Sequence, residues 1–154
     1  MDNKAQLFVI LALLALIMKS VDTVFTGKPA STNAFDYLFV RHSKYPKIAK
    51  AVAMVESDLN PSAIGDAGKA FGLMQIWYPT AQGHGYEGVP YGLLEPEVNI
   101  YYATKELDHL LDTYGTYKGI MGFNIGETQL RKGKIQQEYF NKVQAKLGQV
   151  TLEV

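Results

Sequence analysis

Residues 56–81 read ESDLNPSAIGDAGKAFGLMQIWYPTA, the segment that is most informative about the architecture of this chain. It begins with a glutamate and continues through a glycine-rich run, with Pro61 near its start. Glycine and proline interrupt regular secondary structure, so we expect residues 59–73 to form a loop. The sequence therefore predicts a long, turn-rich segment directly after an acidic residue.

Glu56 is predicted to lie in the last turn of a helix formed by residues 46–57. Ala49, Val52 and Ala53 precede it at helical spacings, so the four side chains share one face. A carboxyl group at the end of an apolar face loses contact with water, and the C-terminus of a helix disfavours its charge. Both effects raise the pKa of the carboxyl group, as a general acid that works near neutral pH requires.

The rest of the chain is predicted to be mainly α-helical, because alternating strand patterns are scarce. Apolar residues between Ile100 and Tyr114 recur every three or four positions, which predicts a long amphipathic helix over residues 97–114. A loop rich in glycine and proline is expected over residues 83–96. The remaining helices are expected at residues 35–42, 75–82, 117–123 and 134–147.

The N-terminal part contains twelve consecutive apolar residues, LFVILALLALIM at 7–18. A helix of that length is about 18 Å long, against a hydrocarbon core of about 30 Å. The pattern extends over residues 5–25 with polar interruptions, so a retained membrane anchor, a cleaved signal peptide and a buried core helix stay open. We expect a signal anchor or transmembrane helix at residues 1–26, a linker at 27–33 and a folded domain at 34–154.

Composition excludes several classes of function. The chain has 15 basic and 15 acidic residues, and this balance gives no electrostatic case for binding nucleic acid. The absence of cysteine excludes a disulfide scaffold, a thiol nucleophile and a cysteine-ligated zinc site. His84 and His109 lack a third ligand at a suitable spacing, so no metal site is predicted.

Several short motifs follow one another in a recognisable order. They are E-S at 56–57, N-P-S-A at 60–63, G-L-M-Q at 72–75, P-E-V-N-I at 96–100, G-F-N-I-G at 122–126 and Y-F-N-K-V at 139–143. Together they resemble the catalytic core of the soluble-type lytic transglycosylases of glycoside hydrolase family 23, from about residue 45 to residue 147. The resemblance implies a lysozyme-like helical domain, preceded here by the hydrophobic N-terminal helix.

The resemblance also implies a reaction. Enzymes of this family cleave the β-1,4 bond between N-acetylmuramic acid and N-acetylglucosamine in peptidoglycan and leave a 1,6-anhydromuramoyl end. One glutamate serves as acid and then as base, because the 6-hydroxyl of the reacting sugar is the nucleophile and is already tethered. No cofactor and no metal are implied.

The resemblance assigns Glu56 as the catalytic residue. The implied substrate-binding residues are Ser57, Met74, Gln75, Tyr78, Phe123, Asn124 and Tyr139. Gln75 and Met74 are expected beside the acid, and Asn124 at the reacting sugar. Ser57 is also expected to fix the turn after the catalytic helix, and Tyr78 to stack on a sugar face.

Phe123 departs from the family pattern, in which a tyrosine hydroxyl is thought to bond to the catalytic carboxyl group. Phenylalanine keeps the ring and loses that bond. Ala70 and Gly65 lie near positions where relatives often carry serine, so further polar groups are missing. We expect Tyr139 to supply the hydroxyl that Phe123 lacks.

Two alternatives stay open. Goose-type lysozymes share the implied fold and hydrolyse the bond, which requires a second carboxylate to activate water. Asp66 in the glycine-rich loop is the first candidate for that role. The other alternative is a catalytically weak, peptidoglycan-binding structural subunit, which the missing tyrosine hydroxyl favours slightly.

The expected partners are the glycan strands of peptidoglycan and, through residues 5–25, a membrane. We expect a membrane-anchored protein whose domain faces the periplasm or cell wall. Local opening of the wall is the expected role, in phage entry, secretion, conjugation or wall turnover. Such a protein would work within a larger virion or secretion assembly.

Overall fold

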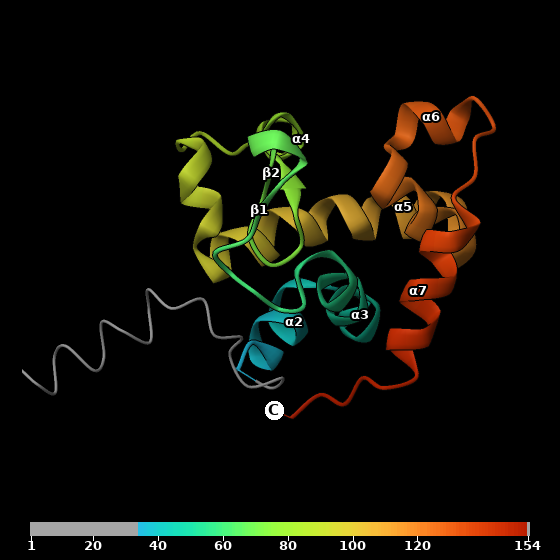
Figure 1. The fold of residues 1–154 in the computed structure, drawn as a ribbon, viewed down its shortest axis with the longest axis horizontal. Coiled ribbons are helices and arrows are strands. Elements are labelled where there is room, and N and C mark those ends of the chain that lie inside the picture. The colour runs from blue at the N-terminus through green and yellow to red at the C-terminus, as the bar shows by residue number, and fades with distance from the viewer. Residues whose placement is uncertain (1–33, 154) are drawn as a thin grey trace, which may run out of the picture.

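The computed structural model describes residues 34–153 (Figure 1). Within this range the fold is mainly helical, as the sequence predicts. The predicted anchor at residues 1–26 and the linker at 27–33 lie outside the described residues. None of the described helices combines the length and the apolar character needed to span a membrane.

The described α-helices are arranged around the longest of them. They are α2 (Asp36–His42), α3 (Pro46–Ser57), α4 (Tyr78–Gly83), α5 (Pro96–Ile125), α6 (Glu127–Arg131) and α7 (Gln137–Leu147). Figure 1 shows α5 crossing the domain, with α4 and the strands towards one end and α6 and α7 at the other. Helices α2 and α3 pack against α5 between these two groups.

The core of the domain is built around α3, whose middle consists of small residues. Ala49, Ala51, Val52 and Ala53 are fully buried. Small side chains at a contact let helix axes approach closely, and α3 packs chiefly against α7 and α2. Helix packing thus fixes the last turn of α3, in which Glu56 lies.

A small antiparallel sheet lies between α3 and α4. Its strands are β1 (Ile64–Gly65), β2 (Ala70–Phe71) and β3 (Ile76–Trp77), and the short 3-10 helix η1 (Asp66–Gly68) joins the first two. Ala70 pairs with Gly65 on one side and with Trp77 on the other. The predicted loop therefore contains strands, which are too short to show an alternating pattern in the sequence.

Asn99 on α5 holds this sheet against the helices. Its buried side-chain amide donates to the carbonyl oxygens of Phe71 and Leu93, each at 2.7 Å, and its Oδ1 accepts the backbone N–H of Met74 at 2.9 Å. Gly72 is required beside it, because a Cβ atom there would lie 2.4 Å from the Asn99 amide nitrogen. One side chain thus fixes the loop from β2 to β3 and the 3-10 helix η2 (Pro90–Leu94).

The predicted helix over residues 75–82 is wrong at its start. Gln75 has a φ of +48°, which is left-handed, and the next two residues belong to β3. Helix α4 begins only at Tyr78. Proline is favoured in the first turn of a helix and disfavoured further in, so Pro79 sets this later start.

Two other predicted boundaries also differ. The last helix starts at Gln137 rather than at residue 134. The two helices predicted over residues 97–114 and 117–123 form one helical run, which bends where Gly115 takes a φ of +74°. Glycine adopts that conformation without steric cost, which explains why the run bends at this residue.

The end of the described chain is tied to the first two helices. Lys50 on α3 lies 2.6 Å from the Asp36 carboxylate on α2, and both side chains are almost fully buried. The Lys50 ammonium also donates to the carbonyl oxygen of Thr151 at 2.8 Å, and the backbone N–H of Glu153 donates to Asp36 at 2.9 Å. This buried pair therefore joins α2, α3 and the residues after α7.

Candidate active site

Glu56 lies half-buried in the last turn of α3. Helix α3 ends one residue later, because Asp58 and Leu59 take left-handed φ values of 52° and 60°. Burial raises the pKa of the Glu56 carboxyl group above its ordinary value. The environment that the sequence predicts for this carboxyl group is the one that the structure shows.

Tyr139 is the hydrogen-bond partner of Glu56. Its hydroxyl donates to Glu56 Oε1 at 2.5 Å, across 83 positions of sequence. The side chain is 7% exposed, and burial together with the Glu56 charge holds the pKa of Tyr139 well above its ordinary value. The phenol therefore stays protonated and donates, and its bond partly offsets the rise in the pKa of Glu56.

Ser57 joins the end of α3 to the loop before β3. Its hydroxyl donates to the carbonyl oxygen of Leu73 at 2.7 Å and accepts the backbone N–H of Asn60 at 3.1 Å. These bonds match the expectation that Ser57 fixes the turn after the helix. They also occupy its hydroxyl, and Ser57 does not line the hollows described below.

Gln75 forms part of the opposite side of the site. Its side-chain amide donates to the carbonyl oxygens of Ala63 at 3.1 Å and Gly72 at 2.9 Å. Its Oε1 lies against Gly65, where a Cβ atom would approach it to 2.3 Å. Any larger residue at position 65 would displace the Gln75 side chain, so this glycine keeps Gln75 in place.

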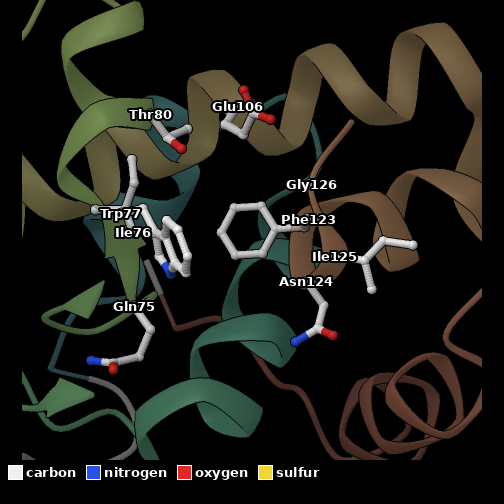
Figure 2. A pocket seen from close by; sticks show the side chains of 9 residues that line it. All are labelled: Gln75, Ile76, Trp77, Thr80, Glu106, Phe123, Asn124, Ile125 and Gly126. Atoms are coloured by element: carbon white, nitrogen blue, oxygen red, sulfur yellow. The ribbon is translucent and has the colours of Figure 1, made fainter. Parts of the chain in front are cut away.

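Two adjoining hollows form a cleft beside Glu56. The larger, of about 360 Å³, is lined by Glu56, Asp66, Ala70, Gln75, Trp77, Phe123 and Asn124. The smaller, of about 140 Å³, is lined by Gln75, Ile76, Trp77, Thr80, Glu106, Phe123, Asn124, Ile125 and Gly126 (Figure 2). Gln75, Trp77, Phe123 and Asn124 line both hollows, so the two are parts of one cleft.

The cleft brings together the end of α3, the sheet and the end of α5. Figure 2 shows Trp77 and Phe123 on opposite sides of the smaller hollow, with Gln75 and Asn124 below them. Glu56, Gln75, Phe123 and Asn124 were all predicted as site residues, and the structure places them around this cleft. Tyr139 does not line either hollow and contacts the site through its hydrogen bond to Glu56.

Two predicted substrate-binding residues lie elsewhere. Met74 is fully buried in the core, and its backbone N–H donates to Asn99 Oδ1. Tyr78 lines a separate apolar groove that Trp77 also borders, and its hydroxyl bonds to the carbonyl oxygen of Gly88 at 3.2 Å. Met74 therefore does not line the cleft beside the acid, whereas the expectation that Tyr78 stacks on a sugar face stays a prediction.

Trp77 is the main cleft residue that was not among the predicted site residues. It is 47% exposed and lines both hollows. In a strand, residues two positions apart share a face. An extended conformation from Gln75 onwards therefore predicts that the side chains of Gln75 and Trp77 both face the cleft. The predicted helix over residues 75–82 places Gln75 and Trp77 on different faces, so the sequence analysis did not group them.

Asp66 and Glu106 are further carboxylates at the cleft. Asp66 lines the larger hollow with Glu56, as the lysozyme alternative requires. Glu106 lines the smaller hollow and was not considered from the sequence. Among residues 34–153 no group of three metal-ligating side chains stands close enough together to hold a metal ion.

Comparisons with known proteins agree with the geometry. The model of the transglycosylase SLT domain family matches residues 36–145. The crystal structure of the 70 kDa soluble lytic transglycosylase from Escherichia coli has a TM-score of 0.58 and 27% identity, over 75% of this chain and 22% of that one. The complex of the 70-kDa soluble lytic transglycosylase with bulgecin A gives 0.58 and 26%, with the same coverage.

These similarities confirm the predicted lysozyme-like helical fold. The chain spans about a fifth of the length of the two solved structures. No curated protein sequence matches it. The finer assignment to glycoside hydrolase family 23 stays a prediction.

Proposed function

Since the chain belongs to the transglycosylase SLT domain family, we propose that it is a lytic transglycosylase that acts on peptidoglycan. The bond cleaved is the β-1,4 linkage between N-acetylmuramic acid and N-acetylglucosamine, and the product carries a 1,6-anhydromuramoyl end. The observation that carries the proposal is the half-buried Glu56 at the end of a cleft, with Tyr139 bonded to its carboxyl group.

In the first step Glu56 acts as a general acid. Because burial raises the pKa of the carboxyl group, a larger protonated fraction persists towards neutral pH than for an exposed glutamate. The proton passes to the glycosidic oxygen as its bond to C1 of the muramoyl sugar breaks. N-acetylglucosamine leaves as an alcohol, and C1 takes on oxocarbenium character.

In the second step the Glu56 carboxylate acts as a base. It removes the proton from the 6-hydroxyl of the muramoyl sugar, whose oxygen bonds to C1 and closes the anhydro ring. This returns Glu56 to its protonated form, so protons balance over the cycle. A tethered nucleophile can have an effective concentration of about 10⁵ M or more, so a single carboxyl group suffices.

Tyr139 serves both steps through one bond. Its hydroxyl fixes the Glu56 carboxyl group and gives the carboxylate formed in the first step a donor. In this proposal Tyr139 replaces the hydroxyl that Phe123 lacks. Gln75 and Asn124, which flank the acid in the cleft, hold the sugars in place.

The test is an analysis of the products from purified peptidoglycan. A band of clearing in a zymogram that Glu56→Gln abolishes would support an enzyme. Mass spectrometry of the fragments would then show anhydro ends. The absence of any band from the folded wild-type chain would instead favour the peptidoglycan-binding subunit.

Hydrolysis is the second candidate, because Asp66 lines the same hollow as Glu56. A lysozyme would use this second carboxylate to activate water. The fragments would then end in reducing muramic acid, and Asp66→Asn would remove the activity. Anhydro ends that persist in Asp66→Asn would contradict this alternative.

We also propose that the domain is anchored in a membrane through residues 5–25 and faces the periplasm or cell wall. The apolar run at 7–18 and the small, polar linker at 27–33 support this placement. The setting that it suits is local opening of the wall, within a virion, a secretion or conjugation assembly, or wall turnover. Fractionation of cells that express the full chain and a chain lacking residues 1–33 would test it, since only the full chain should sediment with membranes.

A further inference from the structure

Glu106 is a carboxylate in the cleft that the proposed mechanism does not use. It extends from α5 and lines the smaller hollow with Trp77, Thr80 and Phe123. The His84 ring nitrogen Nε2 lies 2.7 Å from Glu106 Oε2, and the side chains of this pair are only 24% and 18% exposed. In the described part of the chain no hydrogen bond reaches Oε1, so this oxygen can accept one from a ligand.

The smaller hollow has the size of a six-membered ring. Its volume of about 140 Å³ is close to that of an apolar cavity of about 150 Å³ that binds benzene. The rings of Trp77 and Phe123 border it on opposite sides, as Figure 2 shows. Aromatic faces of this kind suit the C–H faces of a sugar ring.

The ends of the smaller hollow differ. Figure 2 shows Glu106 and Thr80 at one end and Gln75 and Asn124 at the other. Gln75 and Asn124 also line the larger hollow with Glu56. A sugar in the smaller hollow would therefore lie next to the sugar that reacts, with Glu106 at its far end.

We propose that Glu106, oriented by His84, binds this neighbouring N-acetylated sugar and selects for a hydroxyl or amide N–H donor at that position. A carboxylate only accepts hydrogen bonds, and glycan sugars offer both kinds of donor. His84 holds one oxygen in place, so less side-chain freedom is lost when the other binds a sugar. The inference rests on the proposed function only for the nature of the ligand.

The chain offers a direct probe of binding, because Trp77 is its single tryptophan and borders the hollow. In the full chain with Glu56→Gln, which cannot consume substrate, the β-1,4-linked tetramer of N-acetylglucosamine should change the tryptophan emission. Adding Glu106→Leu should raise the Kd about 10-fold or more, as expected for losing a hydrogen bond to a charged group. Adding His84→Ala should raise it about 3-fold, because the carboxylate is then less ordered.

Steady-state kinetics on purified peptidoglycan separate binding from chemistry. In the active chain, Glu106→Leu should raise KM while kcat stays within about 2-fold, the pattern of uniform binding. Glu106→Gln keeps the shape of the side chain and removes its charge, so it serves if the leucine variant melts early in circular dichroism. Glu106→Gln should also raise the Kd, by a smaller factor than Glu106→Leu.

A second glutamate of α5 that contacts a histidine, Glu97, provides the matched control. His42 Nε2 lies 3.1 Å from Glu97 Oε1, and neither residue lines the hollows of the cleft. Glu97→Leu should leave the tetramer Kd and the KM unchanged. It removes a more exposed glutamate–histidine contact of the same helix and so shows what a loss away from the cleft does.

Three results would overturn the inference. They are a wild-type cleft that does not bind the tetramer, a Glu106→Leu Kd within about 2-fold of the parent, and a loss of kcat with unchanged Kd. A loss of kcat with unchanged Kd would show instead that Glu106 takes part in the chemical step. Binding that depends on Glu106 in a chain that cleaves no peptidoglycan would refute the proposed function and leave this inference standing.

Discussion

The two sides of the cleft are built in different ways. Glu56 and Tyr139 stand on α3 and α7, whose packed faces hold them. Trp77 lies in the two-residue strand β3 and Gln75 in the turn before it, and hydrogen bonds hold this segment in place. In the described chain all non-glycine residues with positive φ lie on that side or lead into it, between positions 58 and 75. Apolar packing thus places the acid, whereas polar bonds and unusual backbone conformations shape the opposite side.

The largest effect should come from removing the acid itself. Glu56→Gln keeps the shape of the side chain but can neither donate nor remove the proton, so kcat on peptidoglycan should fall about 1000-fold, within the range for general acid–base groups. Turnover measured by release of soluble fragments checks this value. If the variant keeps a tenth of the wild-type kcat, Glu56 is not the general acid and base of the reaction.

The same variant tests the burial of the acid through stability. A carboxyl group whose folded pKa is raised binds more protons when folded than when unfolded, so it destabilises the fold as pH rises from its ordinary pKa to the raised one. Glu56→Gln removes this penalty. The Tm of the variant should therefore exceed that of the wild type at pH 7 and match it near pH 4, by calorimetry.

Asn99→Ala should show the second-largest effect and act on the opposite side of the cleft. It leaves the buried carbonyl oxygens of Phe71 and Leu93 and the N–H of Met74 without partners. The expected loss is about 3 kcal/mol of unfolding free energy, at about 1 kcal/mol or more for each group. Urea titration measures it.

Asn60 supplies the control for that comparison. Its side chain bonds to an exposed backbone N–H, that of Ser62, at 3.0 Å in the same loop. Asn60→Ala should cost less than about 1 kcal/mol, because water can replace the bond. Equal losses in the two variants would refute the view that Asn99 holds the sheet.

Tyr139→Phe should weaken the helical side without unfolding it. Losing the bond to Glu56 should lower kcat about 10-fold, the value of one hydrogen bond to a charged group. Because that bond lowers the pKa of Glu56, its loss raises this pKa. The fall in activity on the alkaline side should therefore move to higher pH, and an unchanged pH profile would contradict the assigned contact.

Phe123→Tyr should show the smallest effect. It adds the hydroxyl that the family resemblance implies at this position, but Tyr139 already donates to Glu56. We expect kcat to rise by no more than about 2-fold, since only a small part of a hydrogen bond's contribution is still missing. A 10-fold rise would show that Tyr139 is a poor substitute.

The contrast between the two sides of the cleft also explains which parts of the fold and site the sequence predicts. The periodic apolar pattern predicts α3 and the long helix over residues 97–114, because helix packing leaves a regular signal. Glu56 and its raised pKa follow from the same pattern. The partnership with Tyr139 follows from the family resemblance and the missing hydroxyl at Phe123.

The sheet side could not be predicted in the same way. Strands of two residues leave no period, and the left-handed Gln75 follows from contacts with Ala63, Gly65 and Gly72 that lie apart in sequence. Trp77 was not assigned to the site for that reason, whereas Glu106 lies on the predicted long helix and no motif marks it as a cleft residue. Met74 was expected at the sugar, because a motif identifies a segment without saying which of its side chains turn inward.

The buried pair of Asp36 and Lys50 has a consequence for engineering. Because it binds residues 151–153 beside the first described helix, the two ends of the described domain lie next to each other. Domains with adjacent ends tolerate circular permutation and insertion into a host loop. A short linker could therefore join residue 153 to residue 34, and new ends could open in the exposed turn around Gly133 while the cleft stays intact.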